Sequence, residues 1–300
     1  MRNKKLYFLI AVGIILISIF LFYKLYNQRL LEKRKVILKE LESQILEEVK
    51  NFKQKVAIVI VDLKTGYKII LNEKVIFPAA SLIKIPIMGC VYCADKEKIL
   101  DLKQKVILKD LDKTPGSGIL KNFKEGSIFS VEELVNFMIV WSDNTATNIL
   151  IDLLGFDYLN KCFKILGLKD TTISRKILDN KAKQEGKENY TSAFDMSYIL
   201  IKFYKKNFLN KSISQKCLSL LKQQKIRDRI AALLPDSVVV ANKTGLEKGI
   251  CHDVGIIFGK KANILISVLT SHDFKNSQPV KNFISHIAAK VYYSLANYNG

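Results

Sequence analysis

The order of strand-like and helix-like segments limits the folds open to this chain more than any other feature. Two apolar, β-branched runs come early, Val56 to Leu63 and Tyr67 to Asn72, and the turn Lys64 to Gly66 joins them into a predicted hairpin. Three more strand-like runs come late in the chain: Ser237 to Asn242, Asp253 to Gly259, and Ala262 to Thr270. Their short connections predict a meander. This order predicts one antiparallel five-stranded sheet assembled from both ends of the chain.

The residues between the two sets of strands show helical periodicity. Helices are predicted at Ser81 to Lys96, Ser130 to Trp141, Thr145 to Leu154, Tyr158 to Leu166, Ser192 to Lys206, Ser214 to Lys222 and, after the last strand, Pro279 to Leu295. The predicted fold is therefore an α/β (α+β) sandwich in which helices flank the sheet and an all-helical lobe is inserted at about residues 100–225. A functional site is expected in the cleft between the two lobes.

The N-terminus carries a stretch long enough to cross a bilayer. Basic residues precede an uncharged run from Leu6 to Tyr23, and Lys24 follows it. A cleaved signal peptide would have a shorter apolar core and a small-residue cleavage site, and neither is evident. We therefore expect an uncleaved signal anchor at residues 1–28, with a buried core helix as the alternative. The protein would cross the cell membrane once, with its body on the extracytoplasmic side.

The rest of the chain is expected to form a stalk or first helix at residues 29–49 and one globular domain at residues 50–300. The net charge of +20 suggests nucleic acid as a partner, but the lysines are scattered and no nucleic-acid-binding motif accompanies them. We expect a basic, solvated surface that could lie against anionic envelope polymers, no nucleic-acid partner, and a monomer. Neither a metal nor an organic cofactor is implied.

Five cysteines cannot all form disulfides within one chain, because their number is odd. Cys90 and Cys93 form a C-x-x-C pair inside a predicted helix, with no second pair to complete a metal site. We expect buried thiols, and a redox role remains the alternative.

A serine and a lysine interrupt the apolar segment that follows Pro78. Ser81 and Lys84 are three residues apart, so on a helix they share one face. An ammonium group in apolar surroundings near a helix N-terminus loses solvation, and the pKa of Lys84 should fall. The neutral amine could then accept the Ser81 proton. On its own, S-x-x-K is a weak signal.

Two further polar elements come later in the chain. Ser142, Asp143 and Asn144 lie between two predicted helices, where Ser142 or Asn144 could simply act as a helix N-cap. The run Lys243 to Gly245 stands where a predicted strand ends, at Asn242, so a lysine and a hydroxyl would project from the edge of the sheet. A second K-T-G, at Lys64 to Gly66, is interpreted as a hairpin turn.

Together the three elements are far more specific than each one alone. S-x-x-K, S-D-N and K-T-G occur in this order, at a helix start, an interhelical loop and a strand end. In this combination the chain resembles the penicillin-recognising serine enzymes, most closely the class A β-lactamase family. The resemblance extends from about Lys50 to the C-terminus and implies the β-lactamase/transpeptidase-like fold.

The resemblance implies a role for each element. Ser81 would be the acylated nucleophile and Lys84 its activating partner. Ser142 would pass a proton to the leaving nitrogen. Asn144 would hydrogen-bond the side-chain amide of the substrate and help to hold Lys84.

The strand element would bind the other end of the substrate. Lys243 and Thr244, with Gly245 beside them, would bind the substrate carboxylate. The oxyanion hole would be formed by the backbone N–H groups of Ser81 and Leu246. Two fixed donors of this kind stabilise the negative charge that develops when a serine attacks an amide.

The loop between the second and third elements departs from the family pattern. Class A enzymes carry R-x-E-x-x-x-N there, and the glutamate holds the water that hydrolyses the acyl-serine. Arg175 matches the arginine, but Ile177 stands in place of the glutamate and Lys181 in place of the asparagine. The sequence therefore leaves open which group, if any, promotes deacylation.

Three other acids lie in this loop. Asp179 is the nearest to the expected position but is two residues late, and Glu188 lies near the end of the loop. We expect Glu188 to form an ion pair with Arg175 that fixes the loop, with catalysis as the alternative. Glu185 is expected to be solvated.

Three functions remain open at this stage. The first is a membrane-anchored class A β-lactamase-like serine hydrolase acting on β-lactams. The second is a penicillin-binding D,D-carboxypeptidase or transpeptidase acting on peptidoglycan peptides, which the missing glutamate and the anchor favour. The third is a non-catalytic envelope-binding module, which would have no need to keep every polar group of the shared cleft.

Overall fold

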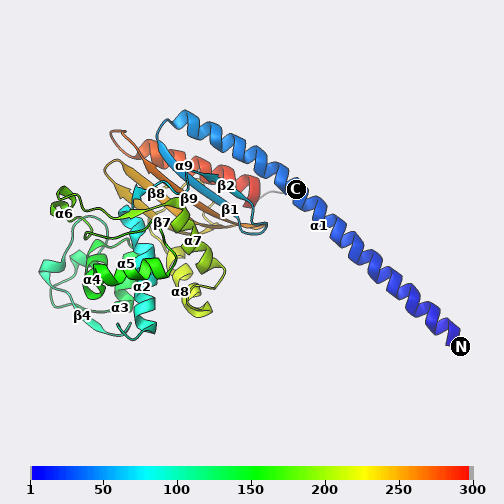
Figure 1. The fold of residues 1–300 in the computed structure, drawn as a ribbon, viewed down its shortest axis with the longest axis horizontal. Coiled ribbons are helices and arrows are strands. Elements are labelled where there is room, and N and C mark those ends of the chain that lie inside the picture. Colours follow the sequence, from blue (N-terminus) through cyan, green and yellow to red (C-terminus); the bar gives the residue numbers. More distant parts are fainter. Residues whose placement is uncertain (1, 297–300) are drawn as a thin grey trace.

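The computed structural model describes residues 2–296, apart from the side chains of residues 2–6 and 9 (Figure 1). The main strands are β1 (Lys55–Asp62), β2 (Lys68–Leu71), β7 (Val239–Glu247), β8 (Ile250–Phe258) and β9 (Asn263–Ser271), and the short ones are β3 (Phe77–Pro78), β4 (Lys105–Ile107), β5 (Ile128–Ser130) and β6 (Tyr190–Thr191). The α-helices are α1 (Arg2–Phe52), α2 (Lys84–Lys96), α3 (Val131–Val140), α4 (Asn144–Leu154), α5 (Phe156–Ile165), α6 (Asn180–Gln184), α7 (Ala193–Tyr204), α8 (Lys211–Lys222) and α9 (Gln278–Val291). Shorter helical turns are Ala80–Ile83, Asp110–Asp112, Leu120–Asn122 and Tyr292–Ala296.

The five main strands form the predicted antiparallel sheet, in the order β2-β1-β9-β8-β7. The first strand of the body pairs with the last, with Ile60 opposite Ile266, so the two ends of the chain meet in the middle of the sheet. Along β1, Ala57 and Val59 point into one apolar core, and Ile58 with Ile60 into another. Since successive residues of a strand face opposite sides, both faces of the sheet are buried, which explains the nearly unbroken apolar run of β1.

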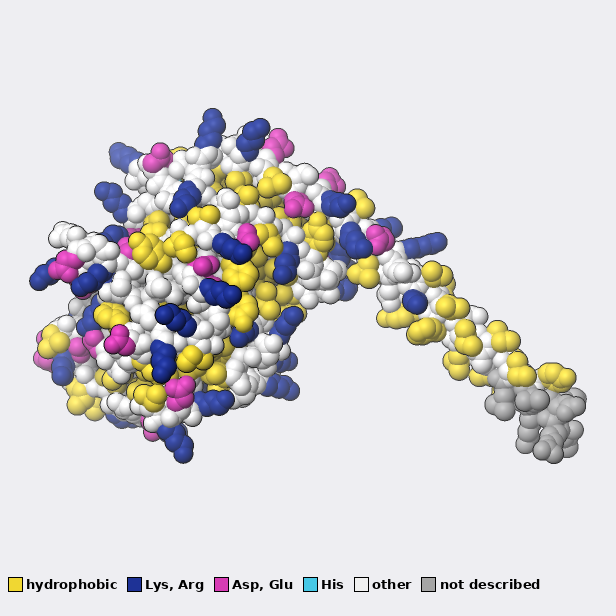
Figure 2. Space-filling model, in the orientation of Figure 1, with side chains coloured by type: hydrophobic (Ala, Val, Ile, Leu, Met, Phe, Trp, Pro, Cys, Tyr) yellow, Lys and Arg dark blue, Asp and Glu magenta, His cyan; other side chains and the backbone are white. Residues whose placement is uncertain are grey.

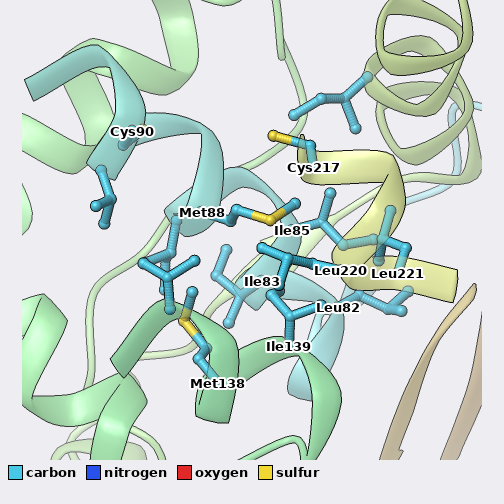
Figure 3. Packing of buried hydrophobic residues seen from close by; sticks show 14 of the residues in the cluster. Leu82, Ile83, Ile85, Met88, Cys90, Met138, Ile139, Cys217, Leu220 and Leu221 are labelled. Carbon is cyan, nitrogen blue, oxygen red and sulfur yellow. The ribbon is translucent and has the colours of Figure 1, made fainter. Parts of the chain in front are cut away.

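Helices cover both faces of the sheet (Figure 1). The C-terminal part of α1 and α9 pack on one face, whereas α2, α7 and α8 lie on the other, together with the rest of the helical lobe. Helix α2 runs through the middle of this second core and packs against α3 and α8. Figure 3 shows Ile85 and Met88 of α2 beside Met138 of α3 and Leu220 of α8. The site is thus built on a helix with no solvated face.

Two strands of the meander are longer than the sequence predicted. Strand β8 begins at Ile250 rather than at the expected Asp253. We expected a strand to end at Asn242, but β7 continues to Glu247 and pairs with β8 throughout, with Thr244 opposite Asp253. Gly245 explains the error, because a glycine inside a strand usually indicates its end or a bulge. Here the absent side chain has a packing role: a Cβ at Gly245 would lie 3.3 Å from the carbonyl oxygen of Ala79.

Helix α1 is continuous from the apolar N-terminal stretch into the body of the protein (Figure 1). Leu38, Leu41 and Ile45 are at most 2% exposed where they pack against the sheet, whereas the preceding part of the helix exposes large apolar side chains, among them Ile14 and Phe20. By length and composition this helix could cross a membrane, and a signal sequence near an N-terminus would meet the same two criteria.

A buried carboxylate joins α1 to the sheet. Asp62, at the end of β1, accepts hydrogen bonds from Arg34 Nε of α1, from the backbone N–H of Lys64 at 3.0 Å and from Thr65 Oγ1 at 2.9 Å. Arg34 also donates to the carbonyl oxygen of Leu295, at 3.0 Å. Burial alone would raise the pKa of Asp62, but the bonds from Arg34, Lys64 and Thr65 outweigh it and lower the pKa. The carboxylate therefore fixes both the β1–β2 turn and the direction of α1.

Replacing this carboxylate should weaken the fold. Asp62→Ala leaves a largely buried guanidinium without its partner, and we expect the free energy of unfolding to fall by about 3 kcal/mol. Glu32→Ala, which removes an exposed pair with Lys35, is the control and should change it by no more than about 0.5 kcal/mol. Thermal unfolding of the full chain in detergent micelles measures both, and equal melting temperatures for the two variants would contradict the role given to Asp62.

Candidate active site

Ser81 lies at a strained turn between a short strand and α2. Ala80, just before it, has φ = 44°, in the left-handed region that a residue with a Cβ rarely adopts. The surrounding backbone holds this turn, because the N–H of Ala79 donates to the carbonyl oxygen of Asn189 at 2.7 Å. Pro86 falls in the first turn of α2, where its missing N–H is no loss. Ser81 is only half-buried and lines a pocket of about 170 Å³.

Lys84 is fully buried directly below this turn. Its Nζ donates to the carbonyl oxygen of Ser142 at 2.8 Å, to Asn144 Oδ1 at 2.9 Å and to Ser142 Oγ at 3.3 Å. Burial lowers the pKa of Lys84 to about 7, although the charge of Asp143 opposes the shift. The expected fall in pKa is thus confirmed. A substantial fraction of neutral amine is available near neutral pH.

A second buried lysine approaches the same hydroxyl from the sheet. Lys243 Nζ, on β7, donates to Ser142 Oγ at 2.8 Å and to the carbonyl oxygen of Thr244 at 2.9 Å. Burial lowers the pKa of Lys243 well below its usual value, and the charge of Lys84 lowers it further. Because Ser142 Oγ accepts from both amines, its own proton is left free for a third partner.

The residue that caps α4 is Asp143, so the expectation that Ser142 or Asn144 would do so is wrong. Asp143 Oδ1 accepts from the N–H of Ala146 at 2.9 Å. Its Oδ2 accepts from the N–H groups of Ile119 and Leu120, each at 2.7 Å. Asp143, the middle residue of the S-D-N element, therefore caps the helix and holds the loop around Ile119 in place. Its two neighbours are left to contact Lys84.

Strand β7 packs tightly against the turn that carries Ser81. The absent side chain of Gly245 allows this approach, and Ser81 and Leu246 line the same pocket. His252 of β8 supports the turn from below, with Nε2 2.9 Å from the carbonyl oxygen of Pro78, while its Nδ1 accepts from the N–H of Thr270. With Nδ1 accepting, Nε2 carries the proton, and burial lowers the pKa of His252 to about 4.

A buried acid lies behind the K-T-G segment. Asp253 accepts from Asn242 Nδ2 at 3.0 Å and from the N–H of Ile230 at 3.0 Å. Burial raises the pKa of Asp253 to about 7, against the opposing charge of Arg229, which is itself 1% exposed. The charge of Asp253 raises the pKa of Lys243 and so opposes part of the lowering that burial causes. No local pattern indicates this cluster, since Arg229 and Asp253 are 24 positions apart in regions without a motif.

The ion pair expected in the polar loop is present. Arg175 is 5% exposed and contacts Glu188 Oε1 through Nη2 at 2.7 Å and through Nε at 2.8 Å. Asn189 reinforces the pair by accepting from the N–H of Ser174 at 2.8 Å and donating to the carbonyl oxygen of Arg175 at 3.0 Å. This network fixes both ends of the loop.

Glu247, at the end of β7, joins the loop to the sheet. Its carboxylate contacts Arg175 Nη2 at 3.2 Å and also pairs with Lys183 of α6. Glu247 was not among the predicted site residues because the predicted strand stopped at Asn242. A strand continued to its true end would have put Lys243 and Glu247 on the same face by the two-residue period.

The remaining loop residues have different surroundings. Ile177 lines the pocket with Ser81. It occupies the position at which the class A pattern R-x-E-x-x-x-N predicts a glutamate. Asp179 does not line the pocket; it caps α6 by accepting from the N–H of Ala182 at 3.0 Å. Glu185 is exposed, as expected, and pairs with Lys187. Among residues 2–296, no group of three or more histidine, cysteine or acidic side chains is placed to hold a metal ion.

The arrangement suits acyl transfer to a serine. The half-buried hydroxyl of Ser81 borders the pocket, and a buried amine of low pKa follows three residues later in the chain. The hydroxyl of Ser142 connects that amine to a second one, on β7. Such a chain can carry a proton from an attacking hydroxyl to a departing nitrogen.

Comparisons with known proteins agree with this geometry. The sequence profile of the Beta-lactamase enzyme family matches residues 40–295. The β-lactamase VEB-1 of Pseudomonas aeruginosa is 26% identical over 232 residues, which cover 73% of this chain and 78% of that protein. A β-lactamase structure from Sphaerobacter thermophilus is 28% identical, with a TM-score of 0.76, and the match covers 83% of this chain and 96% of that one. The structure of PBP-A is 25% identical, with a TM-score of 0.77, over 85% of this chain and 95% of that one.

Neutralising Glu188 should loosen the loop. Glu188→Gln keeps the shape of the side chain but removes the charge from its bonds to Arg175, so we expect the free energy of unfolding to fall by about 1 to 3 kcal/mol. Glu185→Gln, in the same loop but exposed, should leave it unchanged. Thermal unfolding compares the two. A Glu188→Gln protein of unchanged stability that selectively fails to release an acyl group would instead identify Glu188 as a catalytic acid.

Proposed function

The chain belongs to the β-lactamase enzyme family, and on that premise we propose that it is a class A-like serine hydrolase that opens β-lactam rings through an acyl-enzyme on Ser81. The observation that carries the proposal is the buried series Lys84, Ser142 and Lys243 beside a half-buried serine. A module that only binds would gain nothing from burying two lysines around one hydroxyl, since each buried ammonium has a desolvation cost.

In the proposed acylation, Ser81 Oγ attacks the carbonyl carbon of the lactam. The neutral Lys84 amine takes the hydroxyl proton, and the backbone N–H groups of Ser81 and Leu246 stabilise the oxyanion. As the carbon–nitrogen bond breaks, Ser142 gives its proton to the nitrogen and is reprotonated from Lys84. Removing one such oxyanion donor costs serine hydrolases about 10²- to 10³-fold in rate.

Lys243, Thr244 and Asn144 would hold the substrate. Lys243 and Thr244 would bind the substrate carboxylate. The amide nitrogen of Asn144 already donates one hydrogen to the carbonyl oxygen of Pro115 at 2.9 Å, so its second N–H is the one left for the side chain of a substrate. Burial strengthens each of these polar contacts, because few waters compete for them.

A second candidate function is that of a penicillin-binding D,D-peptidase. It is favoured by Ile177, an apolar side chain that lines the pocket where class A enzymes carry the deacylating glutamate. The two acids that do line the pocket, Glu188 and Glu247, are both engaged by Arg175. A variant of the similar protein PBP-A has been solved as an acyl-enzyme complex with penicillin G. In such an enzyme the acyl group of a β-lactam would stay on the serine, because no free acid would activate the water that removes it.

We also propose that α1 anchors the enzyme in the cell membrane, with the catalytic body outside the cytoplasm. Support comes from the exposed apolar side chains of α1, including Ile14, Leu16 and Phe20, which have no partner within residues 2–296. Burying them in hydrocarbon would remove this apolar surface from water.

A fluorescent penicillin tests the chemistry. The full chain in detergent micelles should be labelled covalently, and Ser81→Ala should not be labelled. The matched control is Ser117→Ala, because Ser117 lines the same pocket without an assigned role. Labelling of Ser81→Ala at the wild-type level would overturn the acyl-enzyme on Ser81. Loss of label within minutes would support a β-lactamase, and persistence for hours a peptidase-like enzyme.

The rate of acylation should rise with pH through about 7. Lys84 has a folded-state pKa of about 7, so below that pH the amine is protonated and cannot accept the serine proton. We expect the labelling rate to increase about tenfold per pH unit below this value and to level off above it. Rapid-quench labelling between pH 5.5 and 8.5 measures the profile. A flat profile would exclude Lys84 as the base.

A further inference from the structure

Two turns of the sheet lie beside α1 close to the end of its apolar stretch. Lys64, in the β1–β2 turn, and Lys261, between β8 and β9, line one hollow of about 250 Å³ together with Tyr26 and Leu30 of α1. The uncharged stretch of α1 ends at Tyr23. At 1.5 Å per helical residue, Tyr26 is only about 4.5 Å further along the axis. The two turns therefore reach the level at which the helix would leave the hydrocarbon.

The β1–β2 turn is held in this position. Asp62 accepts from the N–H of Lys64 and from Thr65 Oγ1 while it pairs with Arg34 of α1. Since Arg34 also bonds the carbonyl oxygen of Leu295, the helix is attached at two points. The turn that carries Lys64 cannot move away from α1 without breaking this buried ion pair.

The surface around this junction is basic. It consists of exposed side chains on α1 and on the two turns: Lys24, Arg29, Lys33, Lys64, Lys260 and Lys261. None of the six takes part in an ion pair with a residue between 2 and 296. Between Lys24 and Val36 the only acid is Glu32, which already pairs with Lys35. We call these six residues the basic surface.

We propose that the basic surface docks on anionic phospholipid headgroups and so holds the body against the membrane. The inference rests on the proposed anchoring by α1 and goes beyond it, since a rigid membrane-spanning helix alone leaves its own tilt, and with it the distance of the body from the lipid surface, undetermined. Net charge alone does not select this face, because Figure 2 shows lysines and arginines scattered over the visible surface of the globular body. Position selects it: at physiological salt, charges attract lipids only within about 8 Å, and these lysines lie beside the span.

Lysine footprinting of the full chain in vesicles tests the docking. The protein is reconstituted in mixed phosphatidylglycerol and phosphatidylcholine, or in phosphatidylcholine alone, and an acetylating reagent modifies its amines before mass spectrometry. Lys64, Lys260 and Lys261 should react at least threefold more slowly in the anionic vesicles. Salt at 1 M should abolish the difference, because the screening length is then about 3 Å.

Exposed lysines far from α1 serve as internal controls. They lie around β4, on the opposite side of the body in Figure 1: Lys103, Lys105 and Lys109. Their rates should be the same in both kinds of vesicle. Equal rates at Lys64, Lys260 and Lys261 in protein that floats with the vesicles would overturn the docking and leave the anchoring intact. Protein that does not float would overturn both. Equal protection by inorganic phosphate in phosphatidylcholine vesicles would mean that a free anion binds, and would also overturn the docking.

Charge reversal provides a second measurement. The variant Lys64→Glu/Lys260→Glu/Lys261→Glu should co-purify in mild detergent with at most half the phosphatidylglycerol of the wild type. The matched variant Lys103→Glu/Lys105→Glu/Lys109→Glu changes the net charge equally and should retain the wild-type amount. Labelling by penicillin, which involves none of these lysines, verifies that both variants are folded. Equal lipid content in the two variants would contradict the proposal.

Discussion

Two lysines buried around one serine hydroxyl form the constraint on which the rest of the site depends. Lys84 and Lys243 reach Ser142 Oγ from a helix and a strand that come from different parts of the chain. A buried amine loses its hydrogen bonds to water, so the backbone oxygens of Ser142 and Thr244 must lie in place to accept from Lys84 and Lys243. The hydrogen bonds of these two lysines therefore hold the sheet, the helical lobe and the interhelical turn in fixed positions relative to one another.

Neighbouring features of the site serve this geometry. Asp143 caps α4 and bonds two N–H groups of the preceding loop, so the S-D-N turn is fixed from both sides. Gly245 lets β7 approach the turn that carries Ser81, and His252 holds that turn through the carbonyl oxygen of Pro78. These contacts restrict the sequence: a Cβ at Gly245 would lie 3.2 Å from His252 and 3.3 Å from the carbonyl oxygen of Ala79, so the turn before Ser81 would have to shift.

Much of this could be predicted from the sequence because the signals are local or come in a fixed order. The hairpin at Lys64, the helices and the five-stranded sheet follow from periodicity, and the motif order indicates which polar residues converge. The extension of β7 to Glu247, the capping by Asp143 and the buried Asp253 could not be predicted in this way. Glu247 and Asp253 have partners that are distant in sequence, such as Arg175 for Glu247, and no local pattern reports such a pair. Asp143 caps α4 locally, but all three residues of the S-D-N element are types found at helix N-caps, so the pattern does not select one of them.

Helix α1 continues from its apolar stretch into the body without a flexible segment, and Arg34 locks it to the sheet. For an enzyme held in a membrane by this helix, the rigid connection would restrict the distance between the catalytic pocket and the bilayer. A flexible tether would let the catalytic pocket explore a hemisphere, whereas a rigid rod confines it to a thin layer parallel to the bilayer. Substrates in that layer would be met at a high effective concentration, and polymer outside it would never be reached.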